Sequence, residues 1–485
     1  MNAIVAALNK KGEDCTETVI TMLKAFTHSK VEAFGIASPT VIETEKSIEK
    51  LQSKQLNSSV TTGYIFSKTL PQDIPQAVKL KADATLVFNG RLYPANLKLS
   101  SVKWAAKKFK KELEEAAENF IRESHGDFTF FISKPGRLLA GRDSLGVQPL
   151  YYGENEVLIA LASERKALWK IGLKKTYSFP PGNLALIDEN GLKFKPVKKL
   201  ANPKIVQISI ETAVRKLQNI LLQSVRERVI GLEKVAVAFS GGLDSSLLAF
   251  LTNKVGTNVN LVSVSLENQS EIEYVKKAAE ALKLPLHTRL FKEEDVEKII
   301  PKVLWLIEEA DPIKLSIGIP FYWTAETAAK LGFKVLLAGQ GADELFAGYK
   351  RYLNIYSNYG AKKAQEAVIT DILKLYEKNF ERDFKICNFH NVELRLPFAS
   401  YELVKFAISL PLKLKIQSSN DTLRKHILRE AAKNFGFPQF IVDKPKRAIQ
   451  YATGVSKVIE KLAKKEKLPV KGYVEKIFRK SYSYL

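Results

Sequence analysis

Residues 235–248 combine an apolar strand, a glycine turn and hydroxyl side chains in an order that suits phosphate binding. The run Val235–Phe239 is apolar and rich in β-branched residues, as in a parallel strand buried on both faces. It is followed by Ser240-Gly241-Gly242-Leu243-Asp244-Ser245-Ser246 and then by an apolar helix face. Backbone N–H groups and serine hydroxyls at a helix N-terminus attract an anion, because the helix dipole is positive there. The segment therefore predicts a phosphate-binding loop, with a plain tight turn as the alternative.

A second strand runs into glycines and acids further along the chain. Residues 335–338 are apolar and lead into Gly339-Gln340-Gly341-Ala342-Asp343-Glu344. If the two strands lie parallel in one sheet, their carboxyl ends meet at one edge, so Asp244 and Asp343 face each other across a crevice. Two carboxylates beside a triphosphate suit Mg²⁺, and we expect both to bind it. The alternative is that the helix dipole alone favours acids here.

Two patterns of elements divide the chain into residues 1–200 and 201–485. The first part reads as α+β, with a strand at 3–8, a helix capped by Asp14 and Glu17, a long helix over 102–120, and then short strands. The second part alternates helices with apolar strands at 235–239, 260–266, 286–290 and 335–338, which predicts a doubly wound parallel α/β sheet. Asn202-Pro203 lies in the expected linker.

The composition is that of a globular protein of 485 residues, 46% hydrophobic and 26% charged. Cys15 and Cys387 fit no metal-ligand or disulfide pattern, which indicates a reducing, cytoplasmic location. We expect neither a signal peptide nor a membrane partner, since no apolar run is long enough to span a bilayer. The net charge is +23, but lysines alternate with glutamates over 107–118, so we expect no specific nucleic-acid partner.

Together, residues 240–246 and 339–349 closely resemble the synthetase domain of asparagine synthetases, which combine an ATP-pyrophosphatase domain with a class II amidotransferase architecture. The resemblance extends over nearly the whole chain, with segments 393–398, 425–429 and 444–454 in the family's order. It implies that the adenosine of ATP is bordered by Phe239, Val264, Ala338 and Gly339. It implies that the phosphates are held by Ser240, Gly241, Gly242, Leu243, Asp244, Ser245 and Ser246. It further implies a catalytic set of Lys446, Gln340 and Asp343.

The reaction implied by this resemblance has two steps. Aspartate attacks the α-phosphorus of ATP while Mg²⁺ and Lys446 neutralise the leaving pyrophosphate, and ammonia then converts the β-aspartyl-adenylate to asparagine and AMP. Three positions depart from the family's pattern. Gln340 replaces a glutamate, Ser400 replaces an aspartate, and the expected acid-binding stretch 312–320 has Lys314 as its one basic residue. Two alternatives therefore stay open: an adenylating ligase for another acid and amine, as in lactam-forming relatives, or a non-catalytic regulatory paralogue. A tRNA-modifying pyrophosphatase is disfavoured, because the cysteines lie away from the motifs.

The order of segments in residues 1–200 is similar to the N-terminal-nucleophile glutaminase domain of class II amidotransferases, which implies an αββα fold. In that family a cysteine after the initiator Met attacks glutamine. This sequence has Asn2 there, His28-Ser29-Lys30-Val31-Glu32 in place of His-Arg-Gly-Pro-Asp, and Arg91 in place of a glutamate. We expect the glutaminase activity to be lost, with ammonia taken up free or from a separate glutaminase. The sequence leaves a homodimer open.

Overall fold

The computed structural model describes residues 2–26, 31–81, 83–109, 112–200 and 203–482. The chain divides into two compact units, one mainly of Met1–Lys199 and the other mainly of Leu200–Cys387 and Val392–Tyr484. This division falls beside the expected boundary at residue 200.

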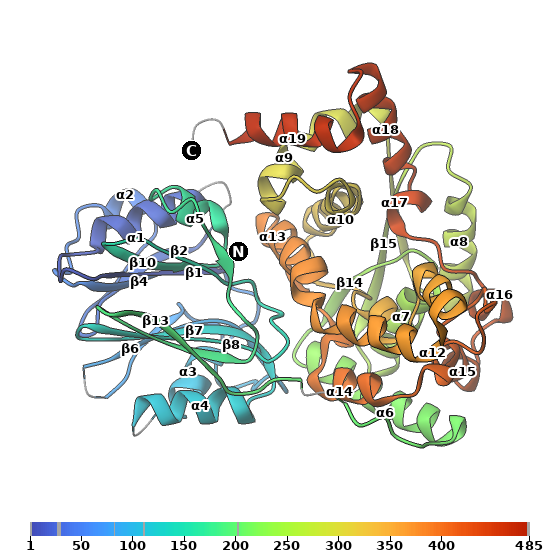
Figure 1. The fold of residues 1–485 in the computed structure, drawn as a ribbon, viewed down its shortest axis with the longest axis horizontal. Helices are drawn as coiled ribbons and strands as arrows, with labels where there is room; N and C mark the ends of the chain where they lie inside the picture. The colour runs from blue at the N-terminus through green and yellow to red at the C-terminus, as the bar shows by residue number, and fades with distance from the viewer. Residues whose placement is uncertain (1, 27–30, 82, 110–111, 201–202, 483–485) are drawn as a thin grey trace. The chain divides into compact units, whose positions relative to one another are not determined.

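The first unit has four layers, with helices outside two stacked antiparallel sheets (Figure 1). In the described residues one sheet has the strand order β11-β9-β10-β1-β4-β2-β3 and the other β13-β12-β8-β7-β6-β5. The elements are β1 (Ala3–Asn9), α1 (Thr16–Leu23), β2 (Ala33–Ala37), β3 (Ile42–Glu45), α2 (Ile48–Leu51), β4 (Val60–Phe66), β5 (Ala77–Lys79), β6 (Thr85–Leu92), α3 (Ser101–Ala106), α4 (Leu113–Glu123), β7 (Gly126–Lys134), β8 (Arg137–Arg142), β9 (Tyr151–Glu154), β10 (Leu158–Ala162), α5 (Arg165–Trp169), β11 (Tyr177–Ser178), β12 (Asn183–Asp188) and β13 (Gly191–Pro196), with a 3₁₀ turn at Lys24–Phe26. The expected αββα arrangement is confirmed.

Side-chain alternation along β1 explains this layering. Ile4, Ala6 and Leu8 point into the core between the two sheets, whereas Val5 and Ala7 pack in a core with residues of α1 and α5. A strand buried on both faces needs apolar residues at every position, and β1 supplies them. A third core, rich in phenylalanine, lies between the second sheet and α3 and α4.

Two expectations for this unit are wrong. The long helix over 102–120 is two helices, α3 and α4, and the lysine-rich stretch 107–111 falls between them. Like charges packed this closely oppose a continuous helix. The capping box of Asp14 and Glu17 does not form, because α1 has Cys15 at its N-cap and Asp14 instead accepts hydrogen bonds from Thr16.

The second unit is built on a parallel sheet with the strand order β16-β15-β14-β17-β18. Its strands and helices up to the end of the sheet are α6 (Ile210–Val229), β14 (Lys234–Ala238), α7 (Leu243–Lys254), β15 (Asn258–Leu266), α8 (Glu271–Leu282), β16 (Leu286–Phe291), α9 (Glu293–Ile307), α10 (Pro312–Lys330), β17 (Val335–Leu337), α11 (Ala342–Leu345), α12 (Lys350–Leu373), a π-helical turn (Tyr376–Phe380), α13 (Glu381–Phe389) and β18 (Glu393–Arg395). The four predicted strands are confirmed, each within about two residues.

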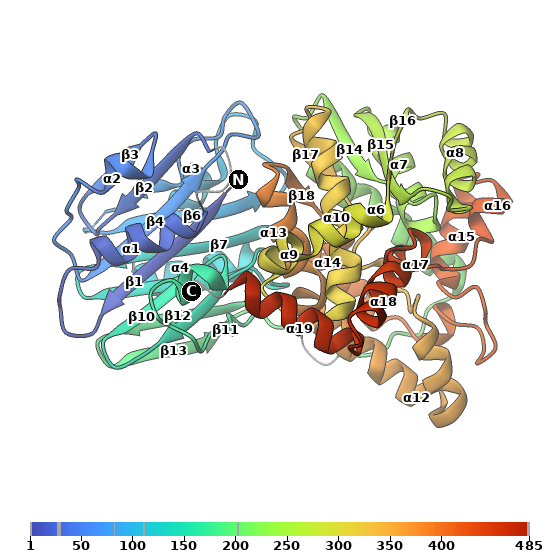
Figure 2. The ribbon, with the colours of Figure 1, turned by 90° about the horizontal axis from the view of Figure 1, so that it is seen from above.

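The strand order places a switch point between β14 and β17. The chain moves outward from β14 to β16 and then returns to β17 on the other side of β14. Right-handed crossovers therefore put α7 and α8 on one face and α9 and α10 on the other. Figures 1 and 2 show the sheet between α7 and α10, which is the doubly wound arrangement expected.

The remainder of the second unit is helical (Figure 2). Its elements are α14 (Tyr401–Ser409), α15 (His426–Asn434), α16 (Gln439–Val442), α17 (Ile449–Ala452), α18 (Val455–Lys465) and α19 (Val470–Ser481), with 3₁₀ turns at Pro397–Ala399 and Leu412–Leu414. None of the helices within the described ranges has both the length and the apolarity to cross a bilayer.

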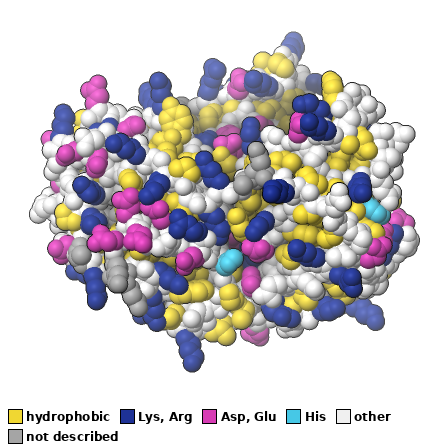
Figure 3. Space-filling model, turned by 60° about the horizontal axis from the view of Figure 1, so that its bottom comes forward, with side chains coloured by type: hydrophobic (Ala, Val, Ile, Leu, Met, Phe, Trp, Pro, Cys, Tyr) yellow, Lys and Arg dark blue, Asp and Glu magenta, His cyan; other side chains and the backbone are white. Residues whose placement is uncertain are grey.

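Positive side chains are spread widely on the surface. On the face drawn in Figure 3, lysines and arginines lie among acidic and apolar side chains rather than in one patch. The net charge of +23 is therefore not concentrated on this face.

Candidate active site

A cavity of about 480 Å³ opens at the carboxyl ends of β14 and β17. This is the switch point of the sheet, where open α/β folds bind ligands. Of the residues predicted from sequence, the cavity is lined by Phe239, Ser240, Gly242, Leu243, Asp244, Ser245, Val264, Ala338, Gly339, Gln340, Asp343 and Lys446. Gly241 and Ser246 do not line it: Gly241 packs toward Tyr274 of α8, and Ser246 is fully buried in α7.

The loop between β14 and α7 is held in a compact turn by its own serines. Gly241 has a φ of +68°, a conformation that favours glycine. The Ser245 hydroxyl accepts a hydrogen bond from the Ser240 backbone N–H at 3.3 Å and donates to the Gly242 carbonyl at 3.1 Å. Gly242 is the N-cap of α7 and supplies no side chain to cap it. The N-terminus of α7 is thus available to an anion in the cavity.

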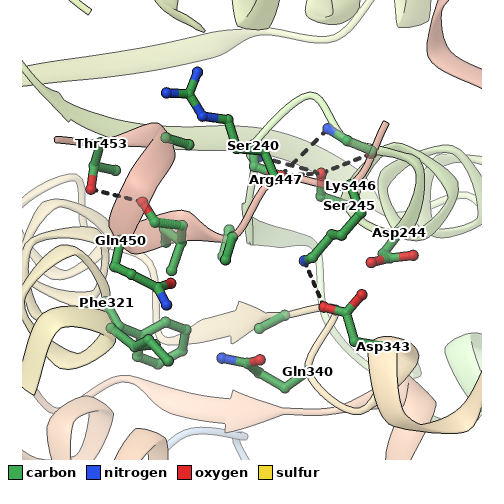
Figure 4. Close-up of a pocket in the computed structure, with 18 of the residues that line it drawn as sticks. Ser240, Asp244, Ser245, Phe321, Gln340, Asp343, Lys446, Arg447, Gln450 and Thr453 are labelled. Carbon is green, nitrogen blue, oxygen red and sulfur yellow. Dashed lines mark hydrogen bonds and ion pairs between the residues drawn. The ribbon is translucent and has the colours of Figure 1, made fainter. Parts of the chain in front are cut away.

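Two lysines and two aspartates form an ion-pair cluster beside this loop. Figure 4 shows three of them, Asp244, Asp343 and Lys446. Lys425 Nζ lies 2.5 Å from Asp244 Oδ2 and 2.6 Å from Asp343 Oδ1. Lys446 Nζ lies 2.6 Å from Asp343 Oδ2. The expectation that Asp244 and Asp343 face each other is therefore confirmed, with the buried Lys425 ammonium between them.

The cluster fixes the charges of its members. Burial would raise the pKa of Asp343, but the charges of Lys425 and Lys446 lower it well below its ordinary value. Burial would likewise lower the pKa of Lys446, whereas Asp343 and Asp244 raise it. Asp343 is therefore a carboxylate and Lys446 a cation at neutral pH.

Glu344 differs from the aspartate next to it. Burial raises its pKa, and the nearby charge of Asp343 adds to that rise. Its Oε1 accepts hydrogen bonds from Tyr349 at 2.6 Å and from Asn379 at 2.7 Å. Glu344 therefore connects Tyr349 and Asn379 at the wall of the cavity, whereas Asp343 contacts the two lysines.

The donor set fits a magnesium ion. Asp244 Oδ1 is buried and accepts no hydrogen bond, whereas Asp343 Oδ1 is buried and paired with Lys425. Mg²⁺ prefers oxygen ligands and takes one or two carboxylates together with phosphate oxygens and waters. In the described part of the chain no three acidic, histidine or cysteine side chains gather around one point. Such a site is therefore completed by phosphate and water.

The side of the cavity that was expected to border adenosine is apolar. Phe239, Val264 and Ala338 are buried at strand ends and line it. A Cβ added at Gly339 would lie 3.3 Å from the Cβ of Asp244, so a larger residue would crowd that aspartate.

The stretch 312–320 forms the first half of α10, and its residues Ile313, Lys314 and Ile317 line the cavity. Lys314 Nζ is held 2.6 Å from Glu309 and donates to the Glu377 carbonyl at 2.8 Å. Ser400, the other departure noted in the sequence, is the N-cap of α14 and does not line the cavity.

Three residues that form part of the site were not predicted from the sequence to do so. Lys425 has a left-handed backbone (φ 54°), as does Arg424 before it, and such strain is typical of functional positions. A Cβ on Gly348 would lie 2.1 Å from Asp343 Oδ1 and 2.3 Å from Lys425 Cε. Asp383 accepts a hydrogen bond from Gln340 at 2.7 Å. Lys425 could have been suspected from its place in the segment 425–429; no local pattern marks Asp383.

In the first unit, the positions expected to bind glutamine are occupied differently. Asn2, just before β1, accepts a hydrogen bond from the Ser67 backbone at 2.9 Å. Arg91 is paired with Asp73 through both guanidinium nitrogens, at 2.7 and 3.0 Å. Burial raises the pKa of Cys15 to about 12, so it is a thiol. His28, Ser29 and Lys30 lie outside the described residues.

Two family profiles match the chain. The profile described as asparagine synthase matches residues 216–362 and 356–481, more than half of the chain, and a glutamine amidotransferase domain matches residues 72–170. The chain belongs to the asparagine synthase family. Family membership makes it a carbon–nitrogen ligase of the class that forms AMP and pyrophosphate.

Similar proteins carry related names. "Putative asparagine synthetase (glutamine-hydrolyzing) 1" of Methanocaldococcus jannaschii is 34% identical over 395 residues, 72% of this chain and 73% of that protein. "Asparagine synthetase B (glutamine-hydrolyzing)" of Escherichia coli is 26% identical over 334 residues, 65% of this chain and 59% of that protein. Among solved structures, glutamine phosphoribosylpyrophosphate amidotransferase from B. subtilis is 14% identical with a TM-score of 0.35, covering 59% of this chain and 65% of that one. These last values support no conclusion about activity.

Proposed function

We propose that this family member uses ATP to activate aspartate and then transfers ammonia to it, giving asparagine, AMP and pyrophosphate. One observation carries the proposal: Lys425 joins Asp244 and Asp343 at the N-terminus of α7, with Lys446 on the other oxygen of Asp343. Charges of both signs around an open helix N-terminus suit a metal–triphosphate that must lose pyrophosphate.

Each group has a part in the proposed first step. The loop 240–245 and the start of α7 hold the β- and γ-phosphates, and the strand ends at Phe239, Val264 and Ala338 contact the adenosine. The aspartate carboxylate attacks the α-phosphorus, and the bond to the pyrophosphate oxygen breaks. Lys446 stabilises the negative charge that develops on the leaving group.

Asp244 would hold Mg²⁺ through Oδ1, which accepts no hydrogen bond. Asp343 would hold it through an oxygen that a lysine contacts in this structure. When bound, the ion neutralises phosphate charge. Lys425 balances the two carboxylates, so it is a second cation that can reach the phosphates.

We also propose that this chain does not hydrolyse glutamine and takes ammonia that is free or supplied by a separate glutaminase. Asn2 carries no nucleophilic thiol, and Cys15 is a buried thiol with a raised pKa. The Arg91–Asp73 pair supports the proposal, because both charges are already engaged with each other.

A second candidate is an adenylating ligase for a different acid and amine. Two features favour it: Lys314, the basic residue of the acid-binding stretch, is engaged by Glu309, and Gln340 cannot act as a base. In this case the reaction at ATP is the same, and only the acid and the amine differ.

One experiment separates these candidates. The protein is incubated with ATP, Mg²⁺, one of a panel of acids that includes aspartate, and either ammonium or glutamine; AMP, pyrophosphate and amide are then measured. We expect asparagine with ammonium and none with glutamine. Turnover only with another acid favours the second candidate, and no nucleotide turnover with any acid contradicts both.

A further inference from the structure

Gln340 is held at the cavity by a buried ion pair. It follows β17 and lines the cavity (Figure 4). Its Nε2 donates a hydrogen bond to Asp383 Oδ2 at 2.7 Å. Asp383 lies in α13 and is fully buried. Arg382, the residue before it, binds the same carboxylate with Nε at 2.7 Å and Nη2 at 3.0 Å.

This pair determines which end of the carboxamide faces the ion pair. A carboxylate only accepts hydrogen bonds, so the NH₂ end of Gln340 must point to Asp383. Burial raises the pKa of Asp383, and the charge of Arg382 and the Gln340 amide oppose that rise. Because Nε2 is engaged, Oε1 is the end of Gln340 that is left for a ligand.

We propose that the Arg382–Asp383 pair positions Gln340 so that its Oε1 faces the cavity and accepts an N–H of the nitrogen nucleophile. This inference rests on the proposed function and adds a positioning device to it. Asp383 does not line the cavity and acts through Gln340, whereas Arg382 holds Asp383 and also borders the cavity. A π-helical turn, Tyr376–Phe380, directly precedes α13, and such turns are frequent at functional sites.

The second step then proceeds without a base at this position. The nucleophile's nitrogen lone pair attacks the acyl carbon, and the bond from that carbon to the AMP oxygen breaks with its electron pair on the phosphate. The proton lost by nitrogen passes to the departing phosphate and then to water, because an amide oxygen is not basic enough to keep it. The site therefore takes a nucleophile that arrives unprotonated, as free ammonia or a weakly basic amine such as hydroxylamine.

The test separates adenylation from nitrogen transfer. ATP–pyrophosphate exchange with the accepted acid measures the first step and requires no nitrogen. The amount of amide or hydroxamate formed per AMP, titrated with ammonium and with hydroxylamine, measures the second. For Asp383→Asn we expect exchange within about twofold of wild type, and a KM for ammonia raised about tenfold, since the amide can now rotate.

A double-mutant cycle distinguishes positioning from a structural effect. Gln340→Leu removes the acceptor and its hydrogen bond to Asp383 but leaves the Arg382–Asp383 ion pair in place, and it should lower the amount of amide formed per AMP by a similar factor. Combining it with Asp383→Asn should cause no further loss, because Asp383 acts only through Gln340. The control is Glu308→Gln, which cuts another buried ion pair of α13, that of Lys385 with Glu308 at 3.0 Å, away from the cavity. Its amide-to-AMP ratio should equal that of wild type.

The outcomes are distinct. This inference is overturned if wild type shows ATP–pyrophosphate exchange and both Asp383→Asn and Gln340→Leu form as much amide per AMP as wild type. The proposed function would still stand in that case. Additive losses in the double variant also overturn this inference. Absence of exchange in the wild type with every acid overturns the proposed function and this inference with it.

Discussion

Lys446 and Lys425 both form ion pairs with Asp343, but their surroundings suit them to different roles. Lys446 contacts Asp343 alone and is a quarter exposed, so it can swing toward a ligand. Lys425 is buried and spans two carboxylates. Lys446 is therefore suited to stabilise charge on a leaving group. Lys425 is suited to hold Asp244 and Asp343 together.

Lys446→Met should lower the rate of AMP formation at saturating ATP by about 100-fold or more, because groups that stabilise developing charge have effects of that size. The measurement is steady-state AMP release with the accepted acid and ammonium. Lys461→Met, which removes an exposed lysine paired with Glu293, is the control. A change of less than about threefold in Lys446→Met would show that this lysine has no part in the step.

Lys425→Met should destabilise the protein by about 3 kcal/mol, because two buried carboxylates lose the charge between them. The same variant should be stabilised more than wild type by added Mg²⁺, since the ion replaces the lost charge. Urea unfolding midpoints with and without Mg²⁺ measure both effects. Equal magnesium shifts in the two proteins would argue against a metal at Asp244 and Asp343.

Lys415 offers a test of burial alone. It is fully buried, Nζ has no hydrogen-bond partner, and burial lowers its pKa from 10.5 to about 7. Between these pH values the unfolded chain binds a proton that the folded chain does not, so this group makes stability rise with pH. Lys415→Met should therefore be more stable at pH 7, by on the order of 2 kcal/mol, and the gain should shrink toward pH 10. A gain that is constant with pH would contradict the shifted pKa.

At the scale of elements, the two site loops were predictable because each is a local pattern. A β-branched run, then glycines, then a helix start specifies a strand, a turn and an open helix N-terminus without reference to the rest of the chain. Lys425 and Asp244 are 181 residues apart, and Gln340 and Asp383 are 43 apart. Contacts over such separations depend on packing, which one sequence does not display.

Gly348 connects these elements. Its position in the motif was visible in the sequence, but the reason for glycine was not: a Cβ would collide with Asp343 and Lys425. We expect Gly348→Ala to separate this ion pair and to reduce ATP–pyrophosphate exchange about tenfold or more. Gly472→Ala, in α19, where the added Cβ would come no closer than 3.5 Å to Pro469, tests for the general cost of replacing a glycine. Equal effects of the two changes would remove Gly348 from the site.

In the whole molecule, the two units differ in which reactions their side chains can support. The second unit keeps every charged group of the cluster, whereas the first has Asn2 at the nucleophile's position and pairs Arg91 with Asp73. The order of the units and their fold classes followed from the sequence, because strand alternation and βαβ periodicity differ. The break between α3 and α4 did not, since an apolar stripe continues through the lysine-rich stretch.

Asn2→Cys alone should not give glutamine hydrolysis, because the Arg91–Asp73 pair is unchanged by it. Glutamate release from glutamine is the measurement, with ammonium-dependent amide synthesis as the check that the variant is intact. Glutamine turnover in the variant would show that the glutamine-binding groups survive in this unit.

We propose that the acid is activated by forming a bond to the α-phosphorus of ATP in the β14–β17 cavity. The most direct measurement uses acid labelled with ¹⁸O in its carboxylate, together with ATP, Mg²⁺ and ammonium, and follows the label by mass spectrometry. If the carboxylate attacks the α-phosphorus, we expect one ¹⁸O in AMP for each amide formed. Amide formation with unlabelled AMP would contradict it.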